Sequence, residues 1–422
     1  MKNKEGNLKH IKNSFTGKQI VMIILLAMTQ FTVILDFMVM SPLGDMLMKS
    51  MELKPSQFGL SVSAYAFSAA ASGILTAGFA DKYDRKKLLL FFYFGFIIGT
   101  LFCSLANTYV LLLMARIVTG LFGGVIGSIS MAIVADIFRL EQRGRVLSFT
   151  QMGMSASQII GIPISLYLAN SVGWQSPFVM IVILSILISL FIIFSFDPMT
   201  HHIAVGSGPN PWKHVTGTLF NRQHSIGFIT TAIMSIGGFM MMPWNSAYLI
   251  NNLHVSAAQL PLIFMAGGIG SLLIMPIVGK LSDRKNKFTI FCIASIWLII
   301  IVLIYTNLPK STFPIVVFLY FSLTVGIVTR MIPSMTLITA LPEVNDRGAF
   351  MSVNASLQQI SGGIAAVIGA LMIGQKTKTS IIENFDVVGY FVVVLTMLSL
   401  ILIRQISNRV NHNSTNTIQA MQ

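Results

Sequence analysis

The sequence predicts an all-α membrane protein in which twelve transmembrane helices form two six-helix bundles related as a repeat. Three observations indicate this fold class. Hydrophobic residues make up 54% of the 422 residues, with a mean hydropathy of +0.78, apolar runs recur along the chain, and patterns from the first half return in the second. Crossing a bilayer takes roughly 20 mainly apolar residues with every backbone polar group paired, so the runs indicate helices; a β-barrel would show short alternating segments.

The first apolar run follows a basic stretch, as a signal peptide would. It is long, contains Asp36 and lacks a small-residue cleavage pattern, so we expect it to be retained as the first span. The twelve expected spans are centred near Leu26, Ala69, Gly95, Gly123, Ser155, Ser185, Ser235, Gly268, Ser295, Val325, Ser361 and Thr396.

A polar stretch divides the spans six and six. It reads "DPMTHHIAVGSGPNPWKHVTGTLFNRQ" and is rich in Pro, Gly and polar residues, which predicts a linker. We therefore expect a basic cytoplasmic tail at 1–19, an N-terminal bundle at 20–196, a cytoplasmic linker at 197–222, a C-terminal bundle at 223–404 and a polar cytoplasmic tail at 405–422.

The cationic residues gather on one side of the expected membrane. With the amino terminus inside, 21 of the 28 Lys and Arg residues lie on that side, five lie opposite, and Arg116 and Arg330 fall inside spans. This bias predicts a multi-pass protein of the plasma (bacterial inner) membrane with both termini in the cytoplasm. It also accounts for the net charge of +14 without nucleic acid as a partner.

The residue types that commonly serve in catalysis, such as Cys and His, do not occur here in the spacings of known catalytic or metal-binding motifs. Cys103 and Cys292 lie in different spans without paired spacing, and no His falls in a span. We find no phosphate-loop lysine motif, nucleophile elbow or zinc pair. We expect a protein that is not an enzyme and binds neither a metal nor a cofactor.

Two motifs recur at nearly one offset. The charged stretch "TAGFADKYDRKKLLL" after the second span returns as "GKLSDRKNKFT" after the eighth, with Asp81 and Asp283 separated by 202 positions. The stretch "RGRVLSFTQMGMSASQIIG" at Arg143 returns as "RGAFMSVNASLQQISGG" at Arg347, 204 positions later. The two matches predict an internal repeat of six spans.

With these motifs the chain resembles the major facilitator superfamily over residues 20–404. That family's signature after spans 2 and 8 is Gly-x-x-x-Asp-Arg/Lys-x-Gly-Arg-Arg/Lys. The first copy here departs from it twice, with its Gly displaced to Gly78 and its second Gly replaced by Asp84. The stretches "ILDFMVMSPLG" and "ARIVTGLFGG" are similar to spans 1 and 4 of twelve-span bacterial drug and metabolite:proton antiporters. Their span 5 motif is partly echoed here.

The resemblance implies a conformational latch. In the family, the loop Asp and Arg, with an acid at the end of span 4, hold the two bundles in one conformation. Asp81, Arg85 and Asp136 occupy these places, and Asp283 is the counterpart of Asp81 in the second copy. The alternative is that the cluster serves only to set topology.

Three ionisable residues fall inside spans, where each costs at least ~2.5 to 3.5 kcal/mol on insertion scales. Asp36 and Arg116 lie at matching depth on spans 1 and 4, which line the central cavity in the family. We expect them to form the proton-coupling element; the alternative is a static ion pair. Arg330, on span 10, has no acid within a span of its own half, so a substrate anion, water or backbone carbonyls must balance it, and we expect it to contact substrate.

Small residues and methionines indicate packing surfaces. The stretches "SAYAFSAAASG" in span 2 and "SGGIAAVIGA" in span 11 predict close helix contact between the halves. The run from Met240 to Met242, followed by a Pro, is most often ordinary span filling. The alternative is a soft cavity wall at a kink, suited to apolar substrates of varied shape, and Met241, Trp244 and Asn245 are the candidate substrate contacts there.

These observations together predict a monomeric secondary transporter in the lipid bilayer. It exports small amphipathic organic compounds in exchange for protons by alternating access. One alternative is a proton-coupled uptake symporter for an organic anion or sugar, favoured by Arg330 and the incomplete span 5 motif. A second is a lipid flippase or a transporter-like receptor.

Overall fold

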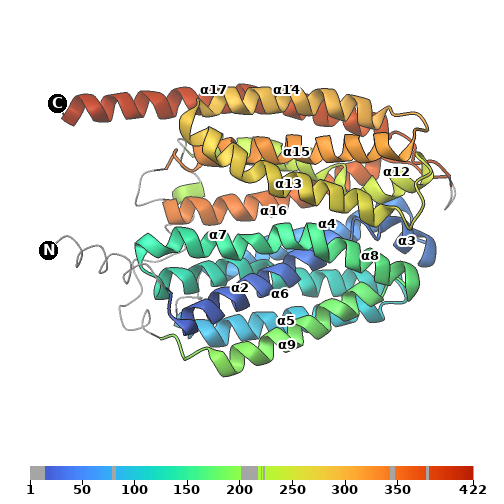
Figure 1. Cartoon of the computed structure of the whole chain (residues 1–422), viewed down its shortest axis with the longest axis horizontal. Helices are drawn as coiled ribbons and strands as arrows, with labels where there is room; N and C mark the ends of the chain where they lie inside the picture. The colour runs from blue at the N-terminus through green and yellow to red at the C-terminus, as the bar shows by residue number, and fades with distance from the viewer. Residues whose placement is uncertain are drawn as a thin grey trace, which may run out of the picture.

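A computed structural model describes residues 15–77, 82–200, 217–219, 221, 224–342, 347–376 and 380–421. Nearly all of these residues are helical, and they form twelve helical segments that are long and apolar enough to cross a membrane. The prediction of an all-α protein with twelve spans is therefore confirmed. The start of the first described helix, α2 (Gly17–Val39), and the end of the last, α17 (Phe385–Met421), lie at one end of the molecule, called here the terminal end, and the opposite end is called the far end (Figure 1).

The first six spans form one bundle. Its helices are α2 (Gly17–Val39), α3 (Gly44–Ser50), α4 (Pro55–Ala77), α5 (Arg85–Leu105), α6 (Tyr109–Ile137), α7 (Leu140–Ala156), α8 (Ile162–Ser171) and α9 (Ser176–Ser195). A π-helical turn at Ser157–Gly161 joins α7 to α8, so that the two helices make one span. The short α3 follows the first span at the far end (Figure 1).

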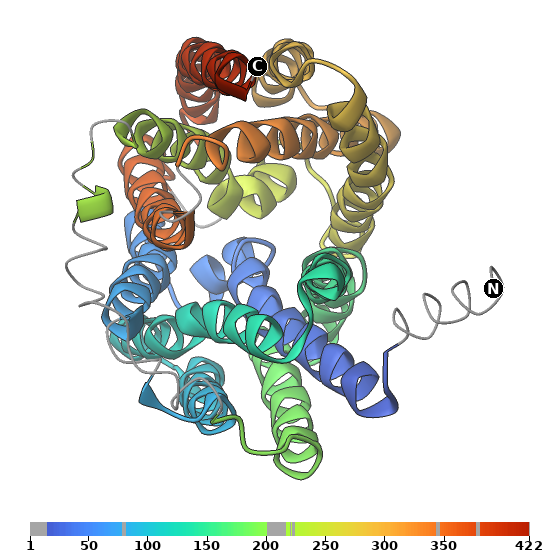
Figure 2. The ribbon, with the colours of Figure 1, turned by 90° about the vertical axis from the view of Figure 1, so that its left-hand side faces the viewer.

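The last six spans form the second bundle. Its helices are α11 (Ser225–Phe239), α12 (Asn245–Asn251), α13 (Leu260–Arg284), α14 (Lys287–Thr306), α15 (Phe313–Ile338), α16 (Arg347–Met372) and α17 (Phe385–Met421). Seen from the terminal end, the two bundles lie one above the other (Figure 2).

The bundles contact each other along α4 with α16 and along α8 with α13. Glycines allow the close approach: a Cβ on Gly59 would lie 2.6 Å from the Cβ of Ala370, and a Cβ on Gly268 would lie 2.8 Å from a side-chain carbon of Ile159. The Ser63 hydroxyl donates to the Gly363 carbonyl at 2.9 Å. The predicted contact between the small-residue faces of spans 2 and 11 is confirmed.

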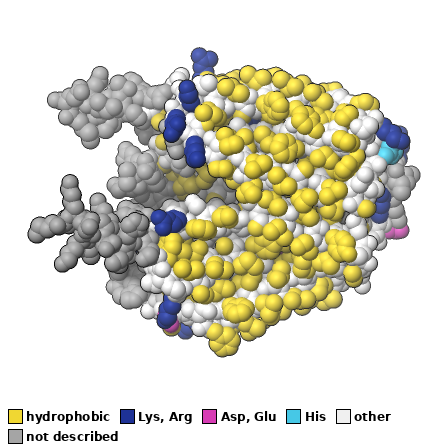
Figure 3. Space-filling view, viewed as in Figure 1, with side chains coloured by type: hydrophobic (Ala, Val, Ile, Leu, Met, Phe, Trp, Pro, Cys, Tyr) yellow, Lys and Arg dark blue, Asp and Glu magenta, His cyan; other side chains and the backbone are white. Residues whose placement is uncertain are grey.

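Hydrophobic side chains cover the middle of the molecule as a band, with Lys and Arg side chains at its ends and more of them at the terminal end (Figure 3). A side face of this kind suits contact with the hydrocarbon of a bilayer, where water cannot satisfy polar groups.

One departure from the signature motif has a structural role. The Asp84 carboxylate caps the start of α5 by accepting from the backbone N–H of Lys86 at 2.8 Å, and it also accepts from the N–H of Met199 at 3.1 Å. In the second half, Asn286 caps α14 by accepting from the N–H of Phe288 at 2.9 Å. The two caps are 202 positions apart, so they occupy equivalent places in the repeat.

Candidate functional site

A cavity of about 330 Å³ lies between the two bundles. Residues of both bundles line it, from α2, α7 and α8 on one side and from α11, α13 and α15 on the other. Its wall is mostly apolar, and its methionines are Met38, Met154, Met234, Met241, Met242 and Met331. Since methionine is flexible and polarisable, such a wall fits apolar groups of varied shape.

Arg330 is the cation in the described lining of this cavity. Its side chain comes from α15 and is 8% exposed. Nη1 donates to the hydroxyl of Thr396 at 3.4 Å, Nη2 donates to that of Ser399 at 2.6 Å, and the guanidinium carbon lies 5.0 Å from the centre of the Phe291 ring. These contacts position the guanidinium while leaving its charge unneutralised.

The seventh span breaks where the methionine run meets Pro243. Helix α11 ends at Phe239, a single 3-10 turn follows at Met242–Trp244, and α12 begins at Asn245. The structure therefore has the kink that the alternative interpretation of this run described. Met241 and Asn245 line the cavity there, and their contact with substrate stays a prediction.

Trp244 is not among the described residues that line this cavity, and its contact with substrate stays a prediction. The indole is fully buried and packs edge-on against Phe58 of α4, with ring centroids 5.7 Å apart. Gly59 and Gly369 provide the space, since a Cβ at either position would approach the indole to 3.2 or 2.9 Å. Trp244 thus fills the contact between the bundles.

Asp36 and Arg116 form a fully buried ion pair, with 2.8 Å between Asp36 Oδ2 and Arg116 Nη1. The hydroxyl of Thr100 donates to the other carboxylate oxygen at 3.3 Å, and the guanidinium carbon lies 4.6 Å from the centre of the Tyr65 ring. Matching depth on spans 1 and 4 thus predicted a contact that the structure contains. The proton-coupling role stays a prediction.

The pair does not line the cavity. The aromatic rings of Phe37 and Tyr65, with centroids 5.3 Å apart, lie next to the ion pair. The Nε and Nη2 atoms of Arg116 are buried and make no hydrogen bond within the described part of the chain. The positive charge of this buried guanidinium is neutralised by the Asp36 carboxylate. Protonation of Asp36 would therefore leave the charge of Arg116 buried without a counter-charge.

The structure describes the side chains of only two of the four residues of the predicted latch, Arg85 and Asp136. Arg85 Nε and Asp136 Oδ2 lie 3.0 Å apart, so this ion pair joins α5 to α6 within the N-terminal bundle. Asp81 and the side chain of Asp283 lie outside the described residues. The role of these four residues in holding the two bundles together therefore stays a prediction.

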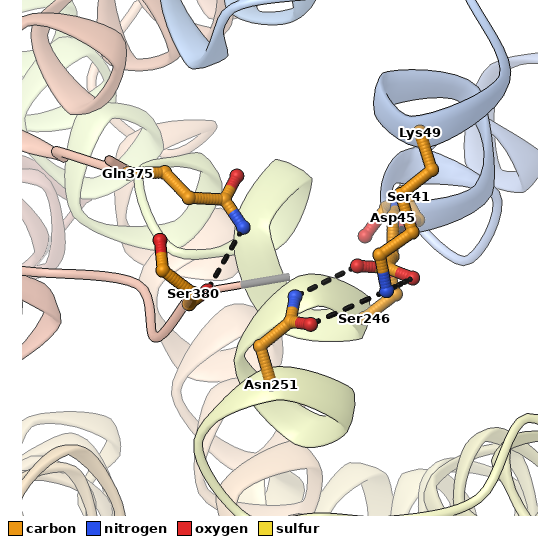
Figure 4. Close-up of polar contacts among 7 residues, drawn as sticks. All are labelled: Ser41, Asp45, Lys49, Ser246, Asn251, Gln375 and Ser380. Carbon is orange, nitrogen blue, oxygen red and sulfur yellow. Dashed lines mark hydrogen bonds and ion pairs between the residues drawn. The ribbon is translucent and has the colours of Figure 1, made fainter. Parts of the chain in front are cut away.

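At the far end, polar side chains join α3 to α12 (Figure 4). The buried Asp45 carboxylate accepts from the Asn251 amide at 2.7 Å and from Lys49 at 2.8 Å, and Lys49 also donates to the Asn251 carbonyl oxygen at 3.3 Å. The Ser246 hydroxyl donates to the Ser41 carbonyl at 2.7 Å, and the Ser41 hydroxyl donates to the Met242 carbonyl. We call these residues the far-end clasp.

Sequence reasoning missed this clasp, although one signal was present. Asp45 and Lys49 are spaced i,i+4 within a short connection after the first span, and an acid and a base at that spacing form a pair on a helix. The partner Asn251 comes from the other half and carries no charge, so the sequence offered no reason to join it to them.

Comparison with known proteins places this architecture among transporters. A sequence profile of the Major Facilitator Superfamily matches residues 26–366. An uncharacterized MFS-type transporter, YbcL of Bacillus subtilis, is 25% identical over 362 residues, covering 85% of this chain and 90% of the relative. A multidrug resistance protein B homolog of Mycobacterium tuberculosis is 26% identical over 386 residues, covering 75% of this chain and 69% of the relative.

Among solved structures, a bacterial homolog of the human lysosomal transporter Spinster, inward-facing and unoccupied, superposes with a TM-score of 0.75. It shares 14% sequence identity and covers 94% of this chain and 98% of its own. At that identity, the likeness shows the shared fold.

Proposed function

This chain belongs to the Major Facilitator Superfamily, and from that membership we propose that it exports small amphipathic organic compounds in exchange for protons. The observation that supports the proposal most is a mostly apolar cavity between the two bundles, together with a fully buried Asp36–Arg116 pair. The pair joins α6 to α2, and α2 also supplies Met38 to the cavity lining. Substrate binds in the cavity, and the pair carries the proton. A proton moving down ~150 mV supplies roughly 3.5 kcal/mol, enough for a few-hundredfold gradient of substrate.

Alternating access follows from the placement of the far-end clasp. The cationic bias of the sequence assigns the terminal end to the cytoplasm, so the clasp closes the outer side of the cavity. Release to the outside then requires α3 and α12 to separate. The state with the clasp intact is the one that takes substrate from the cytoplasm.

The proton site is adjacent to the moving segment. Asp36 lies five positions before Ser41 of the clasp, near the end of α2. Separation of the far end moves this helix end and admits water to the carboxylate, which then takes a proton and releases Arg116. Arg116 and the Thr100 hydroxyl contact Asp36 directly, and the Tyr65 ring contacts Arg116. The Cys103 thiol lies close enough to interact electrostatically with both members of the pair. Arg116 is therefore the charge that responds.

Export is favoured by the multidrug resistance relative and by the methionine-rich wall. An uptake symporter for an organic anion is the second candidate, since Arg330 lacks an acidic partner among the described lining residues. A flippase or a receptor of transporter type would bind in the same cavity without exchanging protons for a soluble compound.

Proton flux in proteoliposomes tests the proposal. The neutral fluorescent amphiphile phenylnaphthylamine is added on one side, and a pH dye reports on the lumen. We expect the substrate gradient to drive proton movement in the opposite direction through the wild type and none through Asp36→Asn. Proton movement in the same direction as the substrate indicates a symporter, and substrate movement without protons removes the coupling claim.

A further inference from the structure

On the basis of the transport function above, we infer that the preferred substrates are amphipathic monoanions. Their acidic group pairs with Arg330, and their apolar part lies along the methionine wall of the same cavity. The shared chemistry is a carboxylate or sulfonate oxyanion attached to an apolar body.

The charge of the cavity wall supports an anion. Among its described lining residues there is one cation, Arg330, and there is no Asp or Glu. The polar neighbours that could face a ligand are neutral, among them Gln158, Asn245 and Gln358. A cationic compound would meet a like charge in a low-dielectric site, whereas an anion would be attracted to the guanidinium of Arg330.

The surroundings of Arg330 do not neutralise it. Its two hydrogen-bond acceptors, Thr396 and Ser399, are hydroxyl groups, and the nearby Phe291 offers only the face of its ring. Nε is buried and makes no hydrogen bond within the described part of the chain. A guanidinium has five N–H donors, so donors remain for an oxyanion while the hydroxyls fix its orientation.

The cavity also has room for the apolar part of such a compound. Its volume of about 330 Å³ falls within the range of sites for small organic ligands. Met234, Met241 and Met331 line the same cavity as Arg330, so one cavity offers both a charged group and an apolar wall.

An anionic substrate has an electrical consequence that depends on direction. Exchange of a neutral compound for n protons moves n charges, whereas export of a monoanion in exchange for n protons moves n + 1. Symport of the monoanion with n protons moves n − 1. The net charge moved per transport cycle therefore differs by one between an anion and its neutral analogue. The anion moves one charge more if it is exported and one charge less if it is taken up, whatever the value of n.

A matched pair of probes tests binding. Anilinonaphthalene sulfonate is phenylnaphthylamine with one sulfonate added, so the two differ by the anionic group alone. Binding is measured by fluorescence on protein in phosphatidylcholine nanodiscs, corrected with empty nanodiscs. We expect Arg330→Gln to raise the Kd of the sulfonate about tenfold or more and to change that of the neutral probe less than about twofold.

Two variants keep this test interpretable. Arg330→Lys retains the charge and is expected to restore much of the sulfonate affinity, and Met331→Leu alters the neighbouring wall without changing charge, so it should affect both probes alike. An equal loss for both probes in Arg330→Gln, with no rescue by lysine, identifies a structural arginine and overturns the inference. A competition measurement gives a second way to overturn the inference. If chloride or phosphatidylglycerol displaces the sulfonate at concentrations similar to those at which the sulfonate binds, an inorganic anion or a lipid headgroup is the occupant of the site.

Transport under an imposed membrane potential separates the two proposals. If a given potential changes the steady-state gradient of the neutral probe about tenfold for one proton, it should change that of the sulfonate about a hundredfold. A weaker potential dependence for the sulfonate than for the neutral probe, with Arg330-dependent binding intact, contradicts export but leaves the anion site standing. Failure of the wild type to transport the sulfonate while it exports the neutral probe overturns the anion site alone.

Discussion

Replacing Asn251 with alanine tests the far-end clasp. The amide of Asn251 is the group on α12 that reaches the buried Asp45 carboxylate and Lys49 across the two bundles. Lys49 contacts Asp45 within α3, so that ion pair persists when the bundles separate. The Asn251 contacts exist only in the closed clasp, and their loss therefore raises the free energy of that state alone.

The magnitude follows from the charge and burial of Asp45. The hydrogen bond from Asn251 is 2.7 Å long, and Asp45 is 5% exposed. A hydrogen bond to a charged group contributes ~1.5 to 3 kcal/mol. Its loss should increase the ratio of outward-open to outward-closed protein by about 10- to 150-fold, until the open state dominates.

Cysteine labelling measures this ratio. Ser235 lines the cavity, and Ser235→Cys in a Cys103→Ser, Cys292→Ser background reports access to it. A membrane-impermeant maleimide is added outside intact cells. We expect Asn251→Ala to speed labelling in proportion to the shift in the ratio.

The matched control is the neighbouring residue. Asn252 donates to the carbonyl of Ile382 at 3.0 Å and accepts from its N–H at 2.8 Å, both within the C-terminal bundle. Asn252→Ala should leave the labelling rate near that of the parent protein. Equal acceleration by both variants would show a general loosening, and no acceleration by Asn251→Ala would refute the clasp.

Further predictions concern the ion pairs and the helix contacts. Asp36→Asn should abolish pH-driven transport while phenylnaphthylamine binding persists without pH dependence, as measured by fluorescence titration. Arg116→Ala should lower stability by about 3–5 kcal/mol in denaturant unfolding and move the pH dependence of transport to higher pH, because the carboxylate loses its counter-charge. Asp136→Asn should lower transport with normal membrane insertion, since it removes a 3.0 Å ion pair of the predicted latch; unchanged turnover would argue against the latch. Gly124→Ala should lower thermal stability by about 1–3 kcal/mol because its Cβ would lie 2.4 Å from that of Ala69, whereas Gly279→Ala meets nothing within 4 Å and should be neutral.

The sequence predicted what depends on position along a helix. The number of spans follows from the length of the apolar runs, and the six-span repeat follows from the offset between the motifs. The ends of the spans then determine how deep each residue lies in the membrane. Depth alone brought Asp36 and Arg116 to one level, and the structure joins them at 2.8 Å.

What depends on the direction of a side chain could not be predicted. Trp244 and Asn245 are neighbours at one kink, yet Asn245 lines the cavity and the Trp244 ring enters the space left by Gly59 and Gly369. The clasp contact between Asp45 and Asn251 likewise joins residues 206 positions apart, one of them uncharged. Both outcomes are decided by how the bundles pack, which no local pattern specifies.

The most direct test of proton-driven export uses inverted membrane vesicles, in which the cytoplasmic side faces the medium. A pH gradient with an acidic lumen is imposed, and accumulation of phenylnaphthylamine and of anilinonaphthalene sulfonate is followed by fluorescence. We expect accumulation by the wild type and none above protein-free vesicles by Asp36→Asn. Accumulation only in right-side-out vesicles with an acidic exterior, or accumulation that persists in Asp36→Asn, would contradict it.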